Sequence, residues 1–481
     1  MAIKKSERHS KQVVSPLAIF AWSKSATAEG FELAGHLELE EQGGAGNANA
    51  ILAGFTYAPA YLAMAGAYHL DPINLPLCAG TVSTQHAFIS LGSIFDAAPD
   101  AWGRRVIHAS EPAMSVDGAT YTQAFLRGAD GIGALLLKPS DGVDSSDGLD
   151  ALVEWSRTER PTLAQLDEAA HASRRLENSE SISDEHRRLL AGSWTIGGAR
   201  PKAIIRNQGD FEMSEPLLGM SLIAKFPSIN EPLDRAGIEW ACLRMARDMG
   251  FEVPGHALAS VATGRTLVLE RFDRYPVASG VNPLMEGRKH YVSANSLVSS
   301  LVESKRMDTA RDRLTFSFGK LMAMAALVAN KPSKARVDMY ARLVLNTALH
   351  NTDDHLKNFG FIQDDDNQSL RLAPVFDLSP QGLTEHFVHL TNLGRKYTVR
   401  DVREQAKFLG IAAGAALEVE EKILSVLEHR ARYYDMAGLP LEQREKIDKL
   451  IERGTGGLLK STAAPTRSPV VIQSASSSLI R

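Results

Sequence analysis

The chain lacks the features that would mark a secreted, membrane-spanning or nucleic-acid-binding protein. Its 481 residues include only two cysteines, Cys78 and Cys242, which we interpret as buried free thiols because neither has a partner at metal-ligand spacing. No apolar run approaches the roughly 18 residues of a membrane span. The formal net charge of -4 gives no general attraction to nucleic acid or anionic lipid. The sequence therefore indicates a soluble globular protein of a reducing compartment.

The N-terminus has two possible interpretations. Basic residues precede the apolar stretch VVSPLAIFAW (residues 13–22), and Ala26-Thr27-Ala28 after it resembles a signal-peptide cleavage site. The apolar stretch has only ten residues and contains Ser15 and Pro16. We therefore interpret it as a first β-strand and keep the signal peptide as the alternative.

The order of patterns predicts three structured parts and a tail, with an α+β fold class. Residues 1–150 are predicted to form an α/β subdomain, because short apolar runs alternate with Gly, Pro and Asp turns. Residues 151–276 are predicted to be rich in strands, with one amphipathic helix (234–250) that Gly250 ends. Residues 277–460 are predicted to be mostly helical, and the Ser-rich residues 461–481 to be a disordered tail.

The stretch HNTDDHLKNFGF (350–361) is unusually polar between apolar flanks. Asp353 and Asn358 are five residues apart, as are the catalytic aspartate and the metal-binding asparagine of a kinase catalytic loop. The histidine, His355, follows the aspartate here, whereas it precedes it in the protein-kinase pattern H-R-D. The spacing is common by chance, and the alternative is a solvated turn. Asp354 receives no role.

A predicted hairpin would bring a second carboxylate to Asn358. Residues 359–363 and 369–376 have the pattern of two strands joined by an acidic turn, which we interpret as a solvated loop. Asp377 follows the second strand and would return toward Asn358. Mg²⁺ prefers carboxylate and amide oxygens together with phosphate, so Asn358 and Asp377 are the predicted metal ligands.

Upstream residues could supply the other parts of a kinase site. Lys225 lies inside an apolar strand, where a lysine is costly unless its charge is used. Glu239 on the following helix could pair with it, the alternative being a solvated helix position. Gly197 and Gly198 could let a backbone approach phosphates, although a pair of glycines is more often only a turn. The Walker pattern is not present.

These segments together resemble the HipA family, the kinase toxins of bacterial HipBA toxin–antitoxin systems. The resemblance rests on GGARPKA, IAKFPS, LERFDR, NTDDHLKNFGF and APVFDLSP, and extends from about residue 13 to 435. It implies a two-lobed protein-kinase-like fold with an additional N-terminal subdomain. It also implies a cytoplasmic bacterial Ser/Thr protein kinase that uses ATP and Mg²⁺.

The resemblance assigns roles to named residues. Asp353 would be catalytic, Glu239 would orient Lys225, and Thr195 or the nearby Ser193 would stand where the family has an autophosphorylated serine. The implied ATP-binding residues are Gly197, Gly198, Ala199, Arg200, Pro201, Lys202, Lys225, Glu270, Arg271, Phe272, His355, Leu356, Lys357, Asn358, Phe376 and Asp377.

The implied partners are a protein substrate, with an aminoacyl-tRNA synthetase or another translation component as an example, and a small helix-turn-helix antitoxin. DNA would be reached only through the antitoxin, and no membrane is involved. Two other functions stay open. The chain could be a non-catalytic corepressor partner of an antitoxin, or a kinase of a small-molecule acceptor.

Overall fold

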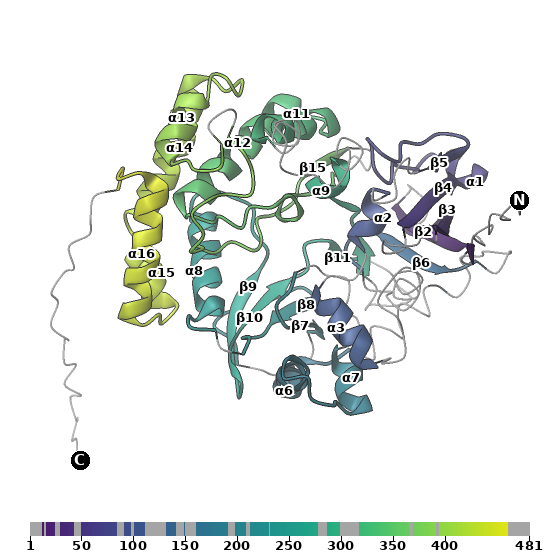
Figure 1. The fold of residues 1–481 in the computed structure, drawn as a ribbon, viewed down its shortest axis with the longest axis horizontal. Helices are drawn as coiled ribbons and strands as arrows, with labels where there is room; N and C mark the ends of the chain where they lie inside the picture. Colours follow the sequence, from purple (N-terminus) through teal and green to yellow (C-terminus); the bar gives the residue numbers. More distant parts are fainter. Residues whose placement is uncertain are drawn as a thin grey trace, which may run out of the picture.

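The N-terminal part of the computed structural model is built on a six-stranded antiparallel sheet (Figure 1). The structure describes residues 12–13, 16–24, 29–42, 50–83, 91–97, 101–110, 131–140, 149, 160–190, 198–207, 212–229, 231–277, 286–298, 317–364, 369–390 and 394–459. The strand order is β5-β4-β3-β2-β6, and β1 pairs with β3. The strands are β1 Gln12–Val13, β2 Leu17–Lys24, β3 Glu29–Gln42, β4 Ala50–Tyr57, β5 Thr81–Ser83 and β6 Leu135–Pro139.

The apolar stretch near the N-terminus forms β2, as predicted. Seven of its eight residues are buried, because β2 lies inside the sheet and has apolar side chains packed on both faces. Helices α1 (Pro59–Leu62) and α2 (Ser93–Asp96) pack against this sheet, whereas α3 (Ala101–Ser110) packs with the later helices α6 (Leu166–Glu177) and α7 (Asp184–Leu190).

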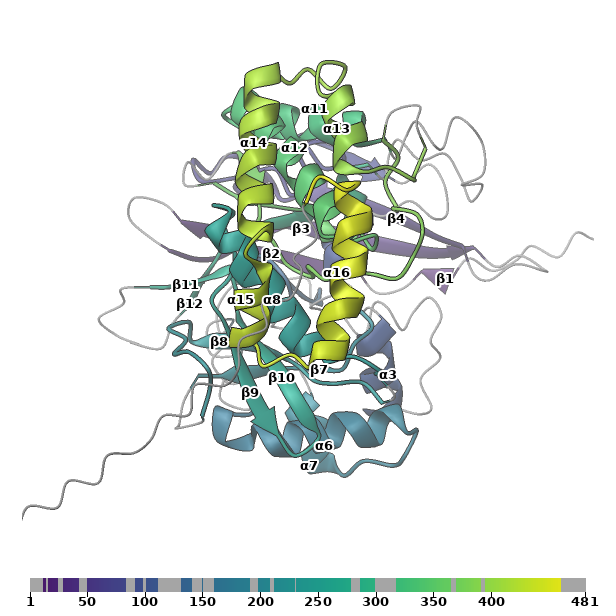
Figure 2. The same cartoon turned by 90° about the vertical axis from the view of Figure 1, so that its left-hand side faces the viewer.

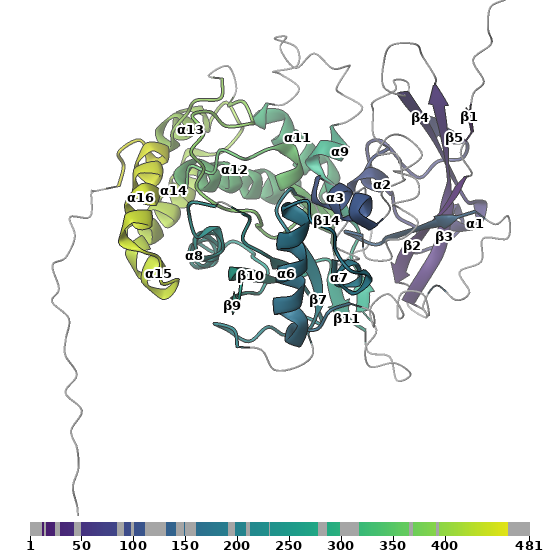
Figure 3. The same cartoon turned by 60° about the horizontal axis from the view of Figure 1, so that its bottom comes forward.

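A second, four-stranded sheet has the antiparallel order β7-β8-β10-β9 and is called the central sheet here. Its strands are β7 Lys202–Arg206, β8 Ser221–Lys225, β9 His256–Val261 and β10 Gly264–Glu270. Apolar residues of α6 (Leu166–Glu177) and α7 (Asp184–Leu190) pack against this sheet, and Figure 3 shows α6 lying across it. The 3-10 helix η1 (Leu163–Gln165) leads into α6.

The predicted amphipathic helix is α8, Arg235–Asp248, which follows β8. Asp234 caps its N-terminus by accepting a hydrogen bond from the Gly237 N–H at 2.9 Å. Gly250, with φ of +88°, follows the last turn, where a left-handed residue is needed. The sequence prediction of this helix and its end is confirmed.

The remaining elements are short hairpins and helices. The strands are β11 Arg274–Pro276, β12 Glu286–Arg288, β13 Tyr291–Ser293, β14 Gly360–Gln363 and β15 Leu370–Leu372. The helices are α9 Ala294–Leu297, α11 Phe318–Val328, α12 Pro332–Ala348, η4 Leu356–Asn358, α13 Val399–Gln405, α14 Ala413–Leu427, α15 Arg430–Met436 and α16 Leu441–Thr455. Figure 2 shows α14 above α15 with α16 beside them, and Figure 1 places these helices at the end of the molecule away from the N-terminal sheet.

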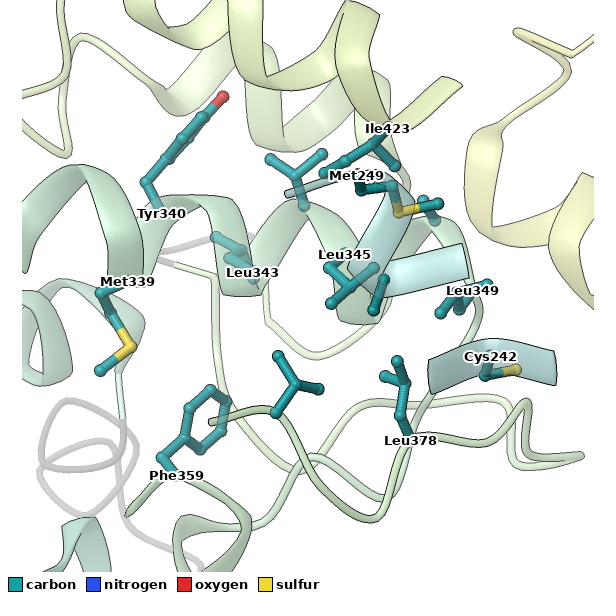
Figure 4. Close-up of a cluster of buried hydrophobic side chains, with 14 of the residues drawn as sticks. Cys242, Met249, Met339, Tyr340, Leu343, Leu345, Leu349, Phe359, Leu378 and Ile423 are labelled. Atoms are coloured by element: carbon teal, nitrogen blue, oxygen red, sulfur yellow. The ribbon is translucent and has the colours of Figure 1, made fainter. Parts of the chain in front are cut away.

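The largest apolar core surrounds α12 and holds the loops that carry Asn358 and Asp377 (Figure 4). Leu343, Leu345 and Leu349 point into this core, which also contains Phe359 and Leu378. Phe359 directly follows Asn358, and Leu378 directly follows Asp377. The two predicted metal ligands are therefore each anchored by a buried apolar neighbour in one core.

Polar contacts join the N-terminal part to the later part of the chain. Asp96 accepts hydrogen bonds from the backbone N–H and the hydroxyl of Ser293, at 2.7 and 2.6 Å. His290 lies 2.8 Å from the Leu70 carbonyl oxygen through Nε2. Burial raises the pKa of Asp96 from 3.8 to about 6, although the hydrogen bonds from Ser293 and the charge of Lys357 oppose the rise.

This carboxyl group gives a pH prediction. The pKa of Asp96 is higher in the folded state than in the unfolded state, so folding takes up protons between pH 4 and pH 6. Its contribution to stability therefore falls as the pH rises through that window. We compare the free energy of unfolding in urea of Asp96→Asn with that of wild type. The difference should shift in favour of the variant by on the order of 2 kcal/mol as the pH rises from 4 to 7. Burial lowers the pKa of His290 to about 4. This group titrates in both proteins, so its contribution cancels in the difference between their stabilities. A difference that does not vary with pH would contradict the prediction.

Several other sequence predictions can be compared with the structure. The mixture of sheets and helices agrees with the α+β class. Cys242 is buried as predicted, but Cys78 is partly exposed because it lies in the irregular segment between α1 and β5. In the described part of the chain, no helix is both long and apolar enough to cross a membrane. The predicted tail, residues 461–481, lies outside the described residues, and the boundaries at 150, 276 and 460 stay predictions.

Candidate active site

Lys225 ends strand β8 with its ammonium between two carboxylates. Its Nζ donates to Glu239 Oε1 of α8 at 2.8 Å and also contacts Asp377 Oδ1. Glu239 is only 4% exposed, so the alternative of a solvated helix position is wrong. The predicted pairing of Lys225 with Glu239 is present, and Asp377 joins it from a segment 152 residues later.

A second lysine stands beside the first. In the antiparallel register of β7 and β8, Lys202 lies directly opposite Lys225, so their side chains share one face of the sheet. Like charges in this position repel each other. Such a pair is stable only where anions compensate it, and Glu239 and Asp377 supply two negative charges.

This arrangement of charges shifts the pKa values of Lys225 and Asp377. Burial alone would lower the pKa of Lys225, but the carboxylates of Asp377 and Glu239 raise it above its ordinary value. Burial alone would raise the pKa of Asp377, but Lys225, Lys202 and His355 lower it. Both groups of the ion pair are therefore charged at neutral pH.

The glycine-containing loop leads into β7 above these lysines. Gly198 has φ of +91°, and a Cβ atom there would lie 3.0 Å from Lys202 Nζ, so the lysine passes beneath the loop. Arg200 fixes the loop by pairing with Glu231 at 3.1 Å. Ala199 is exposed and Pro201 is buried. Gly197 and the two hydroxyl residues Ser193 and Thr195 lie outside the described residues.

The catalytic-loop candidate begins one turn after α12. Asp353 is half-exposed, with 46% of its side chain accessible, and its Oδ1 lies 3.9 Å from His355 Nε2. Asn358 donates its amide N–H to the Asp353 carbonyl oxygen at 2.8 Å, closing the loop across the predicted five-residue spacing. Leu356 is buried and Lys357 is exposed. The loop therefore presents the Asp353 carboxylate at the surface on a fixed backbone.

The predicted hairpin after this loop is present, and the segment that follows it brings Asp377 to Lys225. β14 pairs with β15, and the Ala373 N–H donates to Gly360 O at 2.9 Å. Asp377 adopts φ of +51°, a left-handed conformation that aspartate tolerates better than most residues. The acidic turn at 365–367 lies outside the described residues.

The segment Glu270-Arg271-Phe272 follows β10. The side chain of Glu270 accepts from the Gly219 N–H at 2.8 Å, and the buried Arg271 pairs with Asp273 at 2.7 Å. Both side chains are thus turned to protein partners, so a nucleotide could meet these two residues only through their backbone. The Phe272 ring stacks on that of Phe376, with centroids 5.7 Å apart.

Three structural residues near the site were not found by sequence reasoning. Asp354, to which we gave no role, is only 1% exposed and accepts from the Phe387 N–H at 2.7 Å and from His386 Nδ1 at 2.9 Å. Trp102 donates from its indole N–H to Lys202 O at 3.0 Å, linking α3 to the base of the loop. Asp273 accepts from the Gly133 N–H at 2.7 Å, tying the N-terminal part to the end of β10. The sequence carries no signal for either aspartate, because Asp354 lies in the polar stretch HNTDDHLKN and Asp273 lies between Phe272 and Arg274.

The donor set fits a nucleotide-bound magnesium ion. The described residues contain no group of three or more His, Cys, Asp or Glu side chains that could hold a metal alone. Mg²⁺ that arrives with a nucleotide needs only one or two carboxylates, because phosphates and water complete its octahedron. Asp377 offers a carboxylate, and Asn358, whose amide nitrogen is engaged, offers its amide oxygen.

Comparisons with known proteins identify relatives of this chain. The family model of the HipA-like C-terminal domain matches residues 194–433. The serine/threonine-protein kinase toxin HipA of Shewanella oneidensis is 26% identical over 201 residues, which make up 40% of this chain and 44% of that protein. The protein Y4mE of Sinorhizobium fredii, whose name proposes a kinase, is 28% identical over 205 residues, with the same coverage. The chain thus spans 44% of the length of these curated relatives.

The fold can be compared over a longer range. The structure of the Shewanella oneidensis complex of HipA, HipB and operator DNA contains a chain with the same fold, at a TM-score of 0.58 and 17% identity. That match covers 92% of this chain and 96% of the other, so it includes the N-terminal sheet. The family model covers the central sheet, both lysines, Asp353 and Asp377. The chain belongs to the HipA family.

Proposed function

We propose that the protein is a Ser/Thr protein kinase that transfers the γ-phosphate of MgATP to a protein hydroxyl. In this proposal the central sheet with α8 is the N-terminal lobe of a two-lobed kinase-like fold, and the helical part is the C-terminal lobe. The observation that carries the proposal is the pair of lysines, Lys202 and Lys225, held side by side and facing Asp377. Two cations on one face beneath a glycine-containing loop suit a polyphosphate.

The roles of the residues follow from their charge and position. Lys225, oriented by Glu239, would bind phosphate oxygens and stabilise the charge that moves during transfer. Asp353 would orient the acceptor hydroxyl and accept its proton, because its carboxylate is accessible while its backbone is fixed by Asn358. Bound Mg²⁺ would neutralise phosphate charge, with Asp377 and Asn358 as its protein ligands.

The family relation supports two further parts of the proposal. A small DNA-binding antitoxin would be the partner, and the chain would reach operator DNA only through it. This part rests on the HipA, HipB and operator DNA complex that shares the fold. Autophosphorylation on Thr195 or Ser193 would be the switch.

Mass spectrometry after incubation with MgATP tests the proposal. We expect phosphate on a serine or threonine of the chain, and binding of ATP in calorimetry that weakens at least tenfold when EDTA removes Mg²⁺. ATP binding without transfer to the chain or to any protein of a cell extract would favour the non-catalytic partner. Transfer only to small molecules would favour the other alternative. A chain that does not bind ATP would refute the proposal.

A further inference from the structure

An exposed aromatic side chain stands beside the candidate catalytic aspartate. Phe387 is 44% exposed, and its ring packs edge-on against the His355 ring, with centroids 5.7 Å apart and planes at 83°. His355 in turn lies 3.9 Å from Asp353. Leu383, four residues earlier in the same segment, is 54% exposed. Two large apolar side chains therefore reach solvent from the segment that adjoins the catalytic loop.

The position of Phe387 is fixed by buried polar groups. Asp354 of the catalytic loop accepts from the Phe387 N–H and from the His386 imidazole. The Tyr397 ring stacks on His386 with centroids 4.3 Å apart, and its hydroxyl donates to the Val388 carbonyl oxygen at 3.1 Å. Such a network leaves the phenyl ring little freedom to turn inward. A pre-organised apolar surface loses less conformational entropy when a ligand covers it.

The location determines which ligand this surface would meet. A nucleotide held by Lys202 and Lys225 would place its terminal phosphate toward Asp353, and the acceptor would approach from the exposed side of that aspartate. Phe387 lies on that approach because it contacts His355. An apolar group next to the hydroxyl of the acceptor would cover the phenyl ring. Removal of both apolar surfaces from water would favour binding of that acceptor. The open surface favours a polypeptide over a small molecule, whose sites usually enclose most of the ligand.

We propose that Phe387, positioned by Asp354, is a specificity-determining residue that selects protein acceptors carrying an apolar side chain next to the phosphorylated Ser or Thr. This inference rests on the proposed kinase function and deepens it. It assigns the substrate class by the chemistry beside the hydroxyl.

Synthetic peptides test this inference. Each peptide carries one serine, with Leu, Gly, Asp or Lys at one position within three residues of it, and kcat/KM is measured with MgATP. For the wild type we expect kcat/KM with leucine to exceed that with glycine by roughly tenfold at one or more positions. Phe387→Ser should reduce this ratio to within about twofold of one, and Phe387→Leu should retain most of it. Phe408→Ser, which removes an exposed phenylalanine of another segment, is the matched control and should keep the wild-type ratio.

The outcomes separate this inference from the kinase proposal. The inference about Phe387 would be overturned if peptides were phosphorylated without a preference for leucine, or if Phe387→Ser kept that preference. The kinase proposal would stand in both cases. Autophosphorylation without transfer to any peptide would also overturn the inference about Phe387, because a local apolar contact would then not suffice for recognition. No transfer to any acceptor, with ATP bound or not, would refute the kinase proposal itself. The KM for ATP, measured for each variant, shows whether the nucleotide site is intact.

Discussion

Asp353→Asn is expected to lower phosphate transfer by on the order of 10³-fold while leaving the fold intact. A positioned general base contributes roughly 10²- to 10⁴-fold, and an amide can neither accept the proton nor attract the hydroxyl hydrogen as strongly. The effect on stability should be below about 0.5 kcal/mol, because the carboxylate is half-exposed and its neighbour His355 lies 3.9 Å away. Steady-state transfer and urea unfolding, measured on the same preparation, check both parts.

The adjacent aspartate provides the matched control. Asp354 is buried and accepts hydrogen bonds from Phe387 N–H and His386 Nδ1. Asp354→Ala leaves these donors without an acceptor, so we expect a loss of about 2 to 4 kcal/mol in the free energy of unfolding. Two neighbouring residues of the same type should thus differ in stability: Asp354→Ala loses several times more of the free energy of unfolding than Asp353→Asn. Near-normal transfer by Asp353→Asn would refute its assignment as the catalytic residue.

Part of the site could be predicted because it depends on local patterns. Lys225 lies in an apolar strand, and Glu239 lies on the amphipathic helix that follows it. The two residues are 14 positions apart in one strand–helix unit. The loop from Asp353 to Asn358 and the hairpin leading to Asp377 are also local. Strand and helix periodicity therefore placed these residues on the correct elements.

Other contacts depend on chain segments that no local pattern connects. The register that sets Lys202 opposite Lys225 joins two positions that are far apart in the sequence. Trp102 meets Lys202 across 100 residues, and Asp354 meets His386 across 32. A charged residue that packing will bury looks the same in a sequence as one that stays in solvent. That ambiguity is why Asp354 received no role, although its neighbour Asp353 did.

Lys225→Met is expected to affect both catalysis and stability. Removing one preorganised cation from the transferring phosphate lowers turnover by roughly 10²- to 10³-fold. It also leaves the buried Glu239 and the partly exposed Asp377 without the ammonium that both contact, which should cost about 3 kcal/mol at pH 7. Kinetics and urea unfolding measure the two effects. Lys225→Arg is the control that keeps the charge but changes its geometry, so it should recover most of the stability and little of the turnover.

The pH dependence identifies the source of the lost stability. Lys225 is the strongest of the charges that lower the pKa of Asp377 against the opposing effect of burial. The folded pKa of Asp377 is thus below its unfolded value, so its contribution is present above about pH 4 and is lost as the pH falls through the folded pKa. Without Lys225 this contribution shrinks, so the stability gap between wild type and Lys225→Met should narrow as the pH falls from about 4 to about 2. A gap that stays constant would mean that packing of the lysine side chain, and not its charge, holds the two carboxylate-bearing segments together.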